Sequence, residues 1–175
     1  GRHCMLFHLM RWKQLPPQGP LIVDGFESFE YSQYHPFHHN LAVEADTGFF
    51  CYLTDSELRR KGRMTRYHKR RRSDLEARMG RPSAREIRDG IRELLAVCLQ
   101  GTAAAVVCSD DHRAYPVAMK EVACQIRHEV TSSRLLRDAQ NPLFEVNRLD
   151  NWIRHSSSNH KRETIAWSKR RQASV

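Results

Sequence analysis

The stretch GPLIVDGFESFEYSQYHP, residues 19–36, contains a carboxylate where a buried strand should continue. Its apolar residues 21–23 predict a strand over residues 21–29, and Asp24 interrupts that apolar run. Burying an unpaired charge costs on the order of several kcal/mol, so a carboxylate in such a place is usually paired, bound to a metal ion or placed at a strand end. Asp24 therefore marks either a salt bridge at the end of a strand or a metal site.

A second stretch, TAAAVVCSDDHRAYP (residues 102–116), repeats this pattern, because its apolar run ends at Asp110 and Asp111. Active sites in open α/β sheets gather at the carboxyl ends of strands. If the sheet places the two strands side by side, Asp24 and Asp110 are neighbours, and each raises the pKa of the other unless a cation neutralises them. Asp111 is expected to be a helix N-cap or a group behind the site.

The remaining pattern predicts a mixed α/β fold, one sheet with helices on its faces. An amphipathic helix over residues 1–13 and a Pro- and Gly-containing linker over 14–20 precede the first strand. Ser83 and Glu86 have the spacing of a capping box. The expected strands are 21–29, 40–45, 49–54, 102–109 and 126–132, and the expected helices are 83–99, 115–124 and 141–155.

A third carboxylate is available in the last of these helices. Asp150 lies at helical spacing from Asn147 and Arg154, which share its face. Glu145 is the alternative, and a surface ion pair with Arg154 is the other reading of Asp150. Mg²⁺ (or Mn²⁺) is the natural cation for such oxygen ligands, and two such ions can stabilise the attacking and leaving oxygens of a phosphodiester.

The charge of the chain favours a nucleic-acid partner. The formal net charge is +9 and the pI is about 9.7, which is typical of proteins that bind polyanions. Two basic sets are expected to contact the DNA backbone, although charge runs are often only solvated. Their members are Arg59, Arg60, Lys61, Arg63, Arg66, Lys69, Arg70 and Arg71, with Arg72 closing that run, and then Lys161, Arg162, Lys169 and Arg170.

Other classes of protein and site are disfavoured. No apolar run approaches the roughly 18 residues that a membrane helix needs. The five cysteines form no C-x-x-C pair, so a zinc knuckle is not expected, and buried thiols fit a reducing compartment. His35, His38 and His39 suggest a zinc cluster by composition, but the preferred reading is a loop between the first two strands.

The segments VDGFESFEYSQY, HNLAVE, SDDHRAYP and NPLFEVNRLDNWIRHSSSNHKRETIAWSKRR resemble the catalytic core of bacterial insertion-sequence transposases of the DDE type. The resemblance extends from about residue 21 to the C-terminus. An aspartate at position 150 departs from the family's commoner glutamate. The matching motif residues are Asp24, then Ser109, Asp110 and Tyr115, then Asn147, Arg148 and Asp150, and finally Thr164, Trp167, Ser168 and Lys169.

This resemblance implies an RNase H-like fold with a mixed five-stranded sheet flanked by helices. It implies that Asp24, Asp110 and Asp150 hold Mg²⁺ (or Mn²⁺) and are the catalytic residues. The chain would be a fragment: residues 1–20 would be the tail of a DNA-binding module and its linker, and residues 21–175 the core, with a basic helical insertion at about 55–100.

The implied reaction is cleavage of DNA at an element end followed by strand transfer into target DNA. The implied partners are element-end and target DNA and further copies of the chain assembled on them. The implied location is the bacterial cytoplasm, at the nucleoid. Two alternatives stay open, a metal-dependent nuclease of the same fold and a DNA-binding remnant without catalysis.

Overall fold

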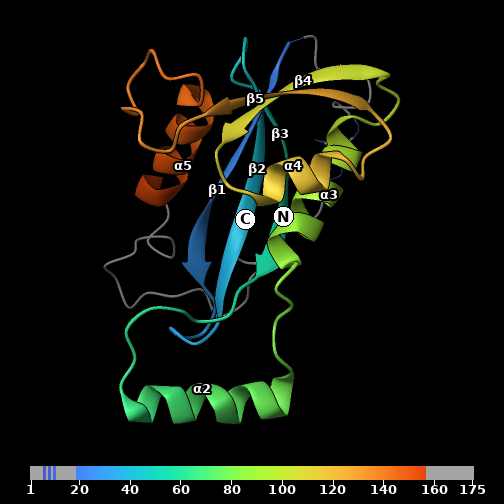
Figure 1. Ribbon diagram of the computed structural model, residues 1–175. Helices are drawn as coiled ribbons and strands as arrows, with labels where there is room; N and C mark the ends of the chain where they lie inside the picture. The colour runs from blue at the N-terminus through green and yellow to red at the C-terminus, as the bar shows by residue number, and fades with distance from the viewer. Residues whose placement is uncertain (1–5, 7, 9, 11–18, 157–175) are drawn as a thin grey trace.

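The computed structural model describes residues 6, 8, 10 and 19–156 and shows a sheet with helices on both faces (Figure 1). Helix α5 covers one face, while α3 and α4 lie on the other. The elements in chain order are β1 (Leu21–Phe29), β2 (Pro36–Glu44), β3 (Phe50–Glu57), α2 (Arg66–Met79), α3 (Glu86–Cys98), β4 (Ala104–Asp110), α4 (Ala114–Met119), β5 (Gln125–Thr131) and α5 (Phe144–Ser156).

The sheet has five strands in the order β3-β2-β1-β4-β5. Strands β1, β2 and β3 form an antiparallel meander, whereas β4 and β5 run parallel to β1. This mixed sheet flanked by helices confirms the α/β fold class and is the RNase H-like arrangement. It also places β1 and β4, the two strands that carry Asp24 and Asp110, next to each other.

Side chains alternate between the two faces of β1, and this alternation divides the core in two. Leu21 and Val23 pack with α3 and α4, whereas Ile22 and Phe26 pack with α5. Asp24 falls between Ile22 and Phe26 in this alternation and therefore belongs to the α5 face. The burial of apolar side chains on both faces fixes the register of β1, because a slip of one residue would move each side chain to the opposite face of the sheet.

Three sequence expectations about local structure are wrong. Strand β2 begins at Pro36, so His38 and His39 lie in a strand and not in a loop. The capping box does not form, because the N-cap of α3 is Arg85 and Ser83 Oγ instead accepts from the Arg85 N–H at 3.1 Å. Helix α4 ends at Met119, short of the expected residue 124.

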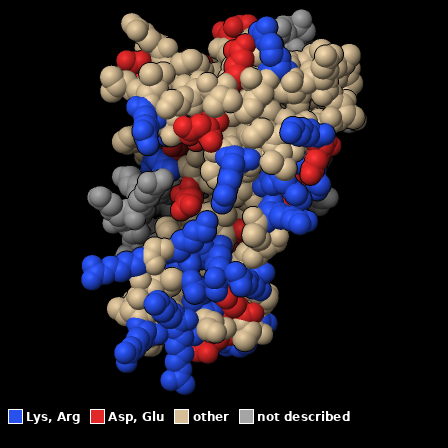
Figure 2. Space-filling view, viewed as in Figure 1, with Lys and Arg blue, Asp and Glu red and all other residues tan. Residues whose placement is uncertain are grey.

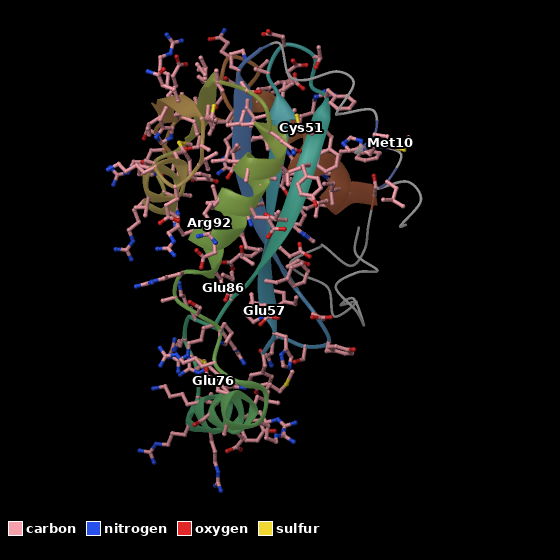
Figure 3. The ribbon with its side chains drawn as sticks, turned by 90° about the vertical axis from the view of Figure 1, so that its right-hand side faces the viewer. Met10, Cys51, Glu57, Glu76, Glu86 and Arg92 are labelled. Carbon is pink, nitrogen blue, oxygen red and sulfur yellow. The ribbon has the colours of Figure 1, made fainter. Side chains whose placement is uncertain are left out.

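The segment expected as a basic insertion, residues 55–100, contains three different structures. Strand β3 continues to Glu57, and α3 is a core helix that contributes Ile91, Leu94 and Leu95. Only α2 and the loops around it stand away from the sheet (Figure 1). Figure 3 shows the separation, with Arg92 and Glu86 on α3 beside the sheet and Glu76 far from it on α2.

The helix expected over residues 1–13 is described only in part. Leu6, His8 and Met10 are helical, and the other residues of the expected 1–13 helix lie outside the described residues. The His8 ring stacks on Phe49 at 5.3 Å, and its Nε2 is 2.7 Å from the carbonyl oxygen of Cys51 on β3. Among the described helices, none has the length and apolar character to cross a membrane.

Candidate active site

Asp24 lies in β1 with its carboxylate largely removed from solvent. Its Oδ1 accepts a hydrogen bond from the Gly25 N–H at 2.8 Å. Burial raises the pKa of Asp24 to about 6; the Gly25 bond and Arg137 oppose this, and the charges of Asp110 and Asp150 add to it. The three predicted carboxylates are therefore close enough for Asp110 and Asp150 to act electrostatically on Asp24.

Asp110 is the last residue of β4, directly beyond the point where this strand pairs with β1. Val23 is opposite Ser109 in the parallel register, so Asp24 and Asp110 are the next residues on two adjacent strands. Asp110 alternates with Cys108, which packs on the α5 face, and so shares the face of Asp24. Its Oδ1 also accepts from the His112 N–H at 2.9 Å, which fixes the turn after the strand.

Asp150 is carried to the same face by α5. Val146 and Leu149 anchor this helix on the sheet. The Asp150 Oδ1 is 2.6 Å from Arg154 Nε, one helical turn on, and the Arg154 guanidinium lies 4.8 Å above the Phe26 ring. The alternative partner considered for Asp150 is thus present, and this ion pair lies over the face that holds Asp24.

The loop before α5 adds a cation, Arg137, that no sequence motif indicated. Arg137 Nη1 donates to Asn147 Oδ1 at 3.1 Å, and the charge of Arg137 lowers the pKa of Asp24. Asn147 is buried, and its Nδ2 also donates to the Leu143 carbonyl at 2.8 Å. Asn147 therefore ties the loop to α5 and holds a positive charge near the carboxylates.

Glu145, the alternative third carboxylate, and Asp111 both have other partners. Glu145 Oε2 pairs with Arg148 Nη2 at 2.6 Å, and this pair sits beside Gly48 in the turn between β2 and β3. Asp111 Oδ2 accepts from the Ser133 N–H at 3.4 Å, and the N-cap of α4 is Arg113. The expectation that Asp111 caps this helix is therefore wrong.

The donor chemistry on this face fits a hard divalent cation, because Asp24, Asp110 and Asp150 all present oxygen ligands. Within the described residues, however, no three His, Cys, Asp or Glu side chains stand close enough together to hold one ion. Asp150 accepts a hydrogen bond from Arg154, and Asp24 accepts one from the N–H of the next residue, Gly25. Binding an ion with all three carboxylates would require Asp150 to exchange Arg154 for the metal.

The histidines of β2 do not form a zinc cluster. His38 and His39 are consecutive strand residues and point to opposite faces. His39 packs against Phe26 and bonds Asp55, whereas His38 bonds Asn40 at 3.0 Å. Burial lowers the pKa of His38 to about 4, with Asp110 among the charges that act on it. His38 is thus neutral near pH 7 and lies on the face of the sheet opposite Asp24.

Gly25 allows β1 and β2 to approach each other beside Asp24. A Cβ at this position would collide with the His39 carbonyl oxygen and the His38 ring. The sequence signal for this contact is the glycine that follows the aspartate, and a glycine within a strand often marks a close approach of backbone.

The first basic set gathers on α2 and its preceding loop, at one end of the molecule. Figure 2 shows lysine and arginine side chains crowded over this end, with a few acidic side chains among them. No residue of α2 is buried. The exposed members are Lys61, Arg63, Arg66, Lys69, Arg70 and Arg71. The second set, Lys161, Arg162, Lys169 and Arg170, lies outside the described residues.

Arg59 and Arg72 have a structural role instead. Arg59 Nε and Nη2 bond the two carboxylate oxygens of Glu76 at 2.8 and 3.0 Å, and Arg72 Nε approaches Glu76 at 3.4 Å. Arg72 Nη1 also donates to the Arg60 carbonyl at 3.0 Å. These bonds hold the loop after β3 against α2. Part of the expected DNA-binding set is therefore committed within the protein.

No protein-family model matches the sequence, and no curated protein matches it. One solved structure that the comparison matches is a chain of the simian T-cell lymphotropic virus intasome in complex with the PP2A regulatory subunit B56 gamma. The match has 15% identity and a TM-score of 0.37, and it covers 81% of this chain and 40% of that chain. The present chain thus spans less than half of that one, and a likeness this weak supports no statement about function.

Proposed function

We propose that this chain is the catalytic core of a DDE-type insertion-sequence transposase. The observation that supports it best is the position of Asp24 and Asp110 as neighbours on one face of an RNase H-like sheet, with Asp150 on the helix over that face. Burial and then the charges of Asp110 and Asp150 raise the pKa of Asp24, and a bound cation would offset these effects by favouring the ionised carboxylate.

In this proposal Asp24 and Asp110 are the shared ligands of Mg²⁺ or Mn²⁺, and Asp150 completes the set. A bound cation of this kind supplies charge stabilisation to the attacking and leaving oxygens of a phosphodiester. Arg154 serves as the counter-ion of Asp150 until the metal and DNA bind. Arg137, held by Asn147, acts electrostatically on Asp24 and would neutralise part of the charge on a phosphate bound there.

The proposed reaction has two steps on DNA. In the first, water would attack the phosphorus at the element end and break its bond to the 3′-oxygen, which leaves a 3′-hydroxyl and a 5′-phosphate. In the second, this hydroxyl would attack a phosphorus of the target DNA and displace the target's own 3′-oxygen. The basic residues of α2 and its loop would hold the DNA backbone without reading sequence. Residues 1–20 as the tail of an end-recognition module, residues 21–175 as the core and assembly of several copies on DNA belong to the same proposal.

Replacing Asp24 by Asn tests the proposal. We expect Asp24→Asn to abolish cleavage and strand transfer, and to abolish Mg²⁺ or Mn²⁺ binding measured by calorimetry with a short duplex, while affinity for that duplex persists. Asp111→Asn is the matched control, because Asp111 is exposed and adjacent to Asp110; it should retain cation binding and cleavage. Cleavage by Asp24→Asn would overturn the proposal.

The same assays separate the alternatives. Cleaved but never joined products would identify a metal-dependent nuclease, and DNA binding without cation binding would identify a non-catalytic remnant.

The third ligand is tested by comparing Asp150→Asn with Glu145→Gln. Because Asp150 lies near Asp24 and Glu145 is paired beside Gly48, only the first should lose cleavage. The reverse result would assign the third carboxylate to Glu145.

A further inference from the structure

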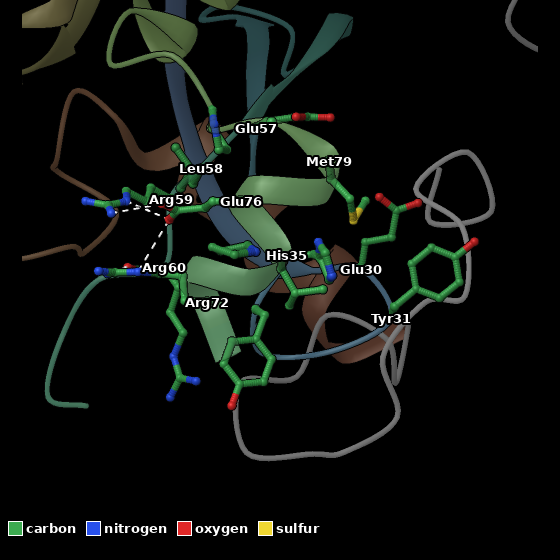
Figure 4. Close-up of a pocket in the computed structure, with 15 residues that line it drawn as sticks. Glu30, Tyr31, His35, Glu57, Leu58, Arg59, Arg60, Arg72, Glu76 and Met79 are labelled. Carbon is green, nitrogen blue, oxygen red and sulfur yellow. Dashed lines mark hydrogen bonds and ion pairs between the residues drawn. The ribbon is translucent and has the colours of Figure 1, made fainter. Parts of the chain in front are cut away.

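A second candidate site lies between the β1–β2 turn and α2, apart from the three carboxylates. It is a cavity of about 180 Å³, bounded by the turn residues 30–36 on one side and by α2 with the loop before it on the other. Figure 4 shows Tyr31 and Met79 at one end of this pocket and Arg59 and Arg60 at the other. None of Asp24, Asp110 and Asp150 lines it.

Tyr31 presents a large aromatic surface at the mouth of the pocket. Its side chain is 61% exposed, and its backbone has a φ of 58°, the left-handed region that tyrosine seldom adopts. The turn is held in this shape by a hydrogen bond from the Glu30 N–H to the His35 carbonyl at 2.9 Å. Met79 is also exposed, at 70%, and Leu75 and Pro36 extend the apolar lining. The pocket thus offers one exposed aromatic ring with apolar walls around it.

The charged groups of the pocket favour a neutral ligand. Three arginines and three glutamates line it, so the carboxylates oppose an anion inside. Glu76 is engaged by Arg59 and Arg72. The Arg60 guanidinium lies 4.8 Å from the centre of the Tyr34 ring, and its Nη1 is shielded from solvent without a hydrogen-bond partner among the described residues.

The surface around the pocket, in contrast, favours anions. The exposed cations of the first basic set flank the pocket on α2 and its loop, where phosphates would be favoured (Figure 2). Proteins that hold unpaired nucleic-acid bases combine a basic track for the backbone with aromatic rings on which bases stack. We propose that this pocket binds one unpaired base of DNA, stacked on Tyr31, while the adjoining phosphates contact the basic surface. This inference rests on the proposed function, since it takes DNA as the partner.

The test compares two labelled DNA duplexes that differ at one position. One has a single unpaired adenine, and the other has an abasic site there. We expect the protein to bind the first about 5- to 150-fold more tightly by fluorescence anisotropy, the range for stacking one base. Tyr31→Gly, which also relieves the left-handed backbone, should abolish this preference and keep affinity for the abasic duplex. Tyr67→Ala is the control, since Tyr67 is 70% exposed on α2 outside the pocket, and should retain it.

Equal affinity of the wild type for the two duplexes would overturn the inference and leave the transposase proposal standing. A preference that survives Tyr31→Gly, or one that disappears equally in Tyr67→Ala, would also overturn it. Failure to bind either duplex would remove the DNA partner and the inference with it. Cleavage that persists in Asp24→Asn is a separate result, which contradicts the proposed chemistry without bearing on the pocket.

Discussion

At the scale of single residues, the stability of the protein should depend on the ionisation of Asp24. Its pKa is about 6 in the folded chain and 3.8 as an ordinary aspartate, so the folded state keeps the proton longer and the free energy of unfolding falls as pH rises through that window. At about 1.4 kcal/mol per pH unit, ionised Asp24 costs the metal-free protein about 3 kcal/mol near neutral pH.

We therefore expect Asp24→Asn to match the wild type near pH 4 and to be more stable by about 3 kcal/mol above pH 7, in urea unfolding with a chelator present. His38 has the opposite slope, because its pKa falls to about 4 and acid favours its unfolded, protonated form. Because both proteins contain His38, its contribution cancels when their free energies of unfolding are subtracted. A difference that does not vary with pH would contradict the buried-carboxylate account.

At the scale of elements, Gly90 decides how closely α3 packs on the sheet. A Cβ there would collide with Ser56 Oγ on β3 and Asn40 Nδ2 on β2, which are both buried. Alanine usually stabilises a helix interior by about 0.5–1 kcal/mol relative to glycine. Here we expect Gly90→Ala to lower the free energy of unfolding by about 1–3 kcal/mol, since crowding outweighs propensity.

Urea unfolding checks the sign of this effect. Glu93→Ala, on the exposed side of the same helix, is the control and should change stability little. If Gly90→Ala proves neutral or stabilising, the neighbouring polar side chains can move aside, and the close approach of α3 to the sheet would not depend on this glycine.

At the scale of the whole molecule, basic side chains are concentrated at one end (Figure 2). Asp24, Asp110 and Asp150 lie on the sheet and α5, whereas the first basic set lies on α2 and its loop, beyond the end of the sheet (Figure 1). Each phosphate that a cation contacts contributes about 0.9 to the slope of log affinity against log salt for duplex DNA. Affinity measured at one salt concentration would not reveal this dependence.

We expect replacement of Arg66, Lys69, Arg70 and Arg71 by glutamine to reduce that slope by up to about 3.6, equally for unrelated duplex sequences. Fluorescence anisotropy from low to moderate salt measures it. Arg92→Gln on α3 is the control, because Arg92 is paired with Asp89 and Glu121 on another part of the surface. An unchanged slope in the α2 variant would place the DNA elsewhere.

The sequence alone determined the fold class and the residues from which a site could be built. Apolar runs ending in Asp24 and Asp110 predicted two strands, and helical spacing placed Asp150, Asn147 and Arg154 on one face; these are local patterns, set by neighbours along the chain. Local patterns did not predict that α3 begins after Arg85 or that β2 begins at Pro36 and includes His38 and His39. The start of a helix or strand depends on packing as well as on neighbours along the chain. The metal and the reaction stay predictions.

The tertiary structure decided which of these residues meet. The order β3-β2-β1-β4-β5 brings Asp24 beside Asp110 across 85 intervening residues, and α5 adds Asp150 together with its Arg154 partner. It also forms the pocket between Tyr31 and α2 and commits Arg59 to Glu76. The physical reason is that strand order follows from burying apolar side chains on both faces of one sheet, and that condition is met only when distant segments pack together.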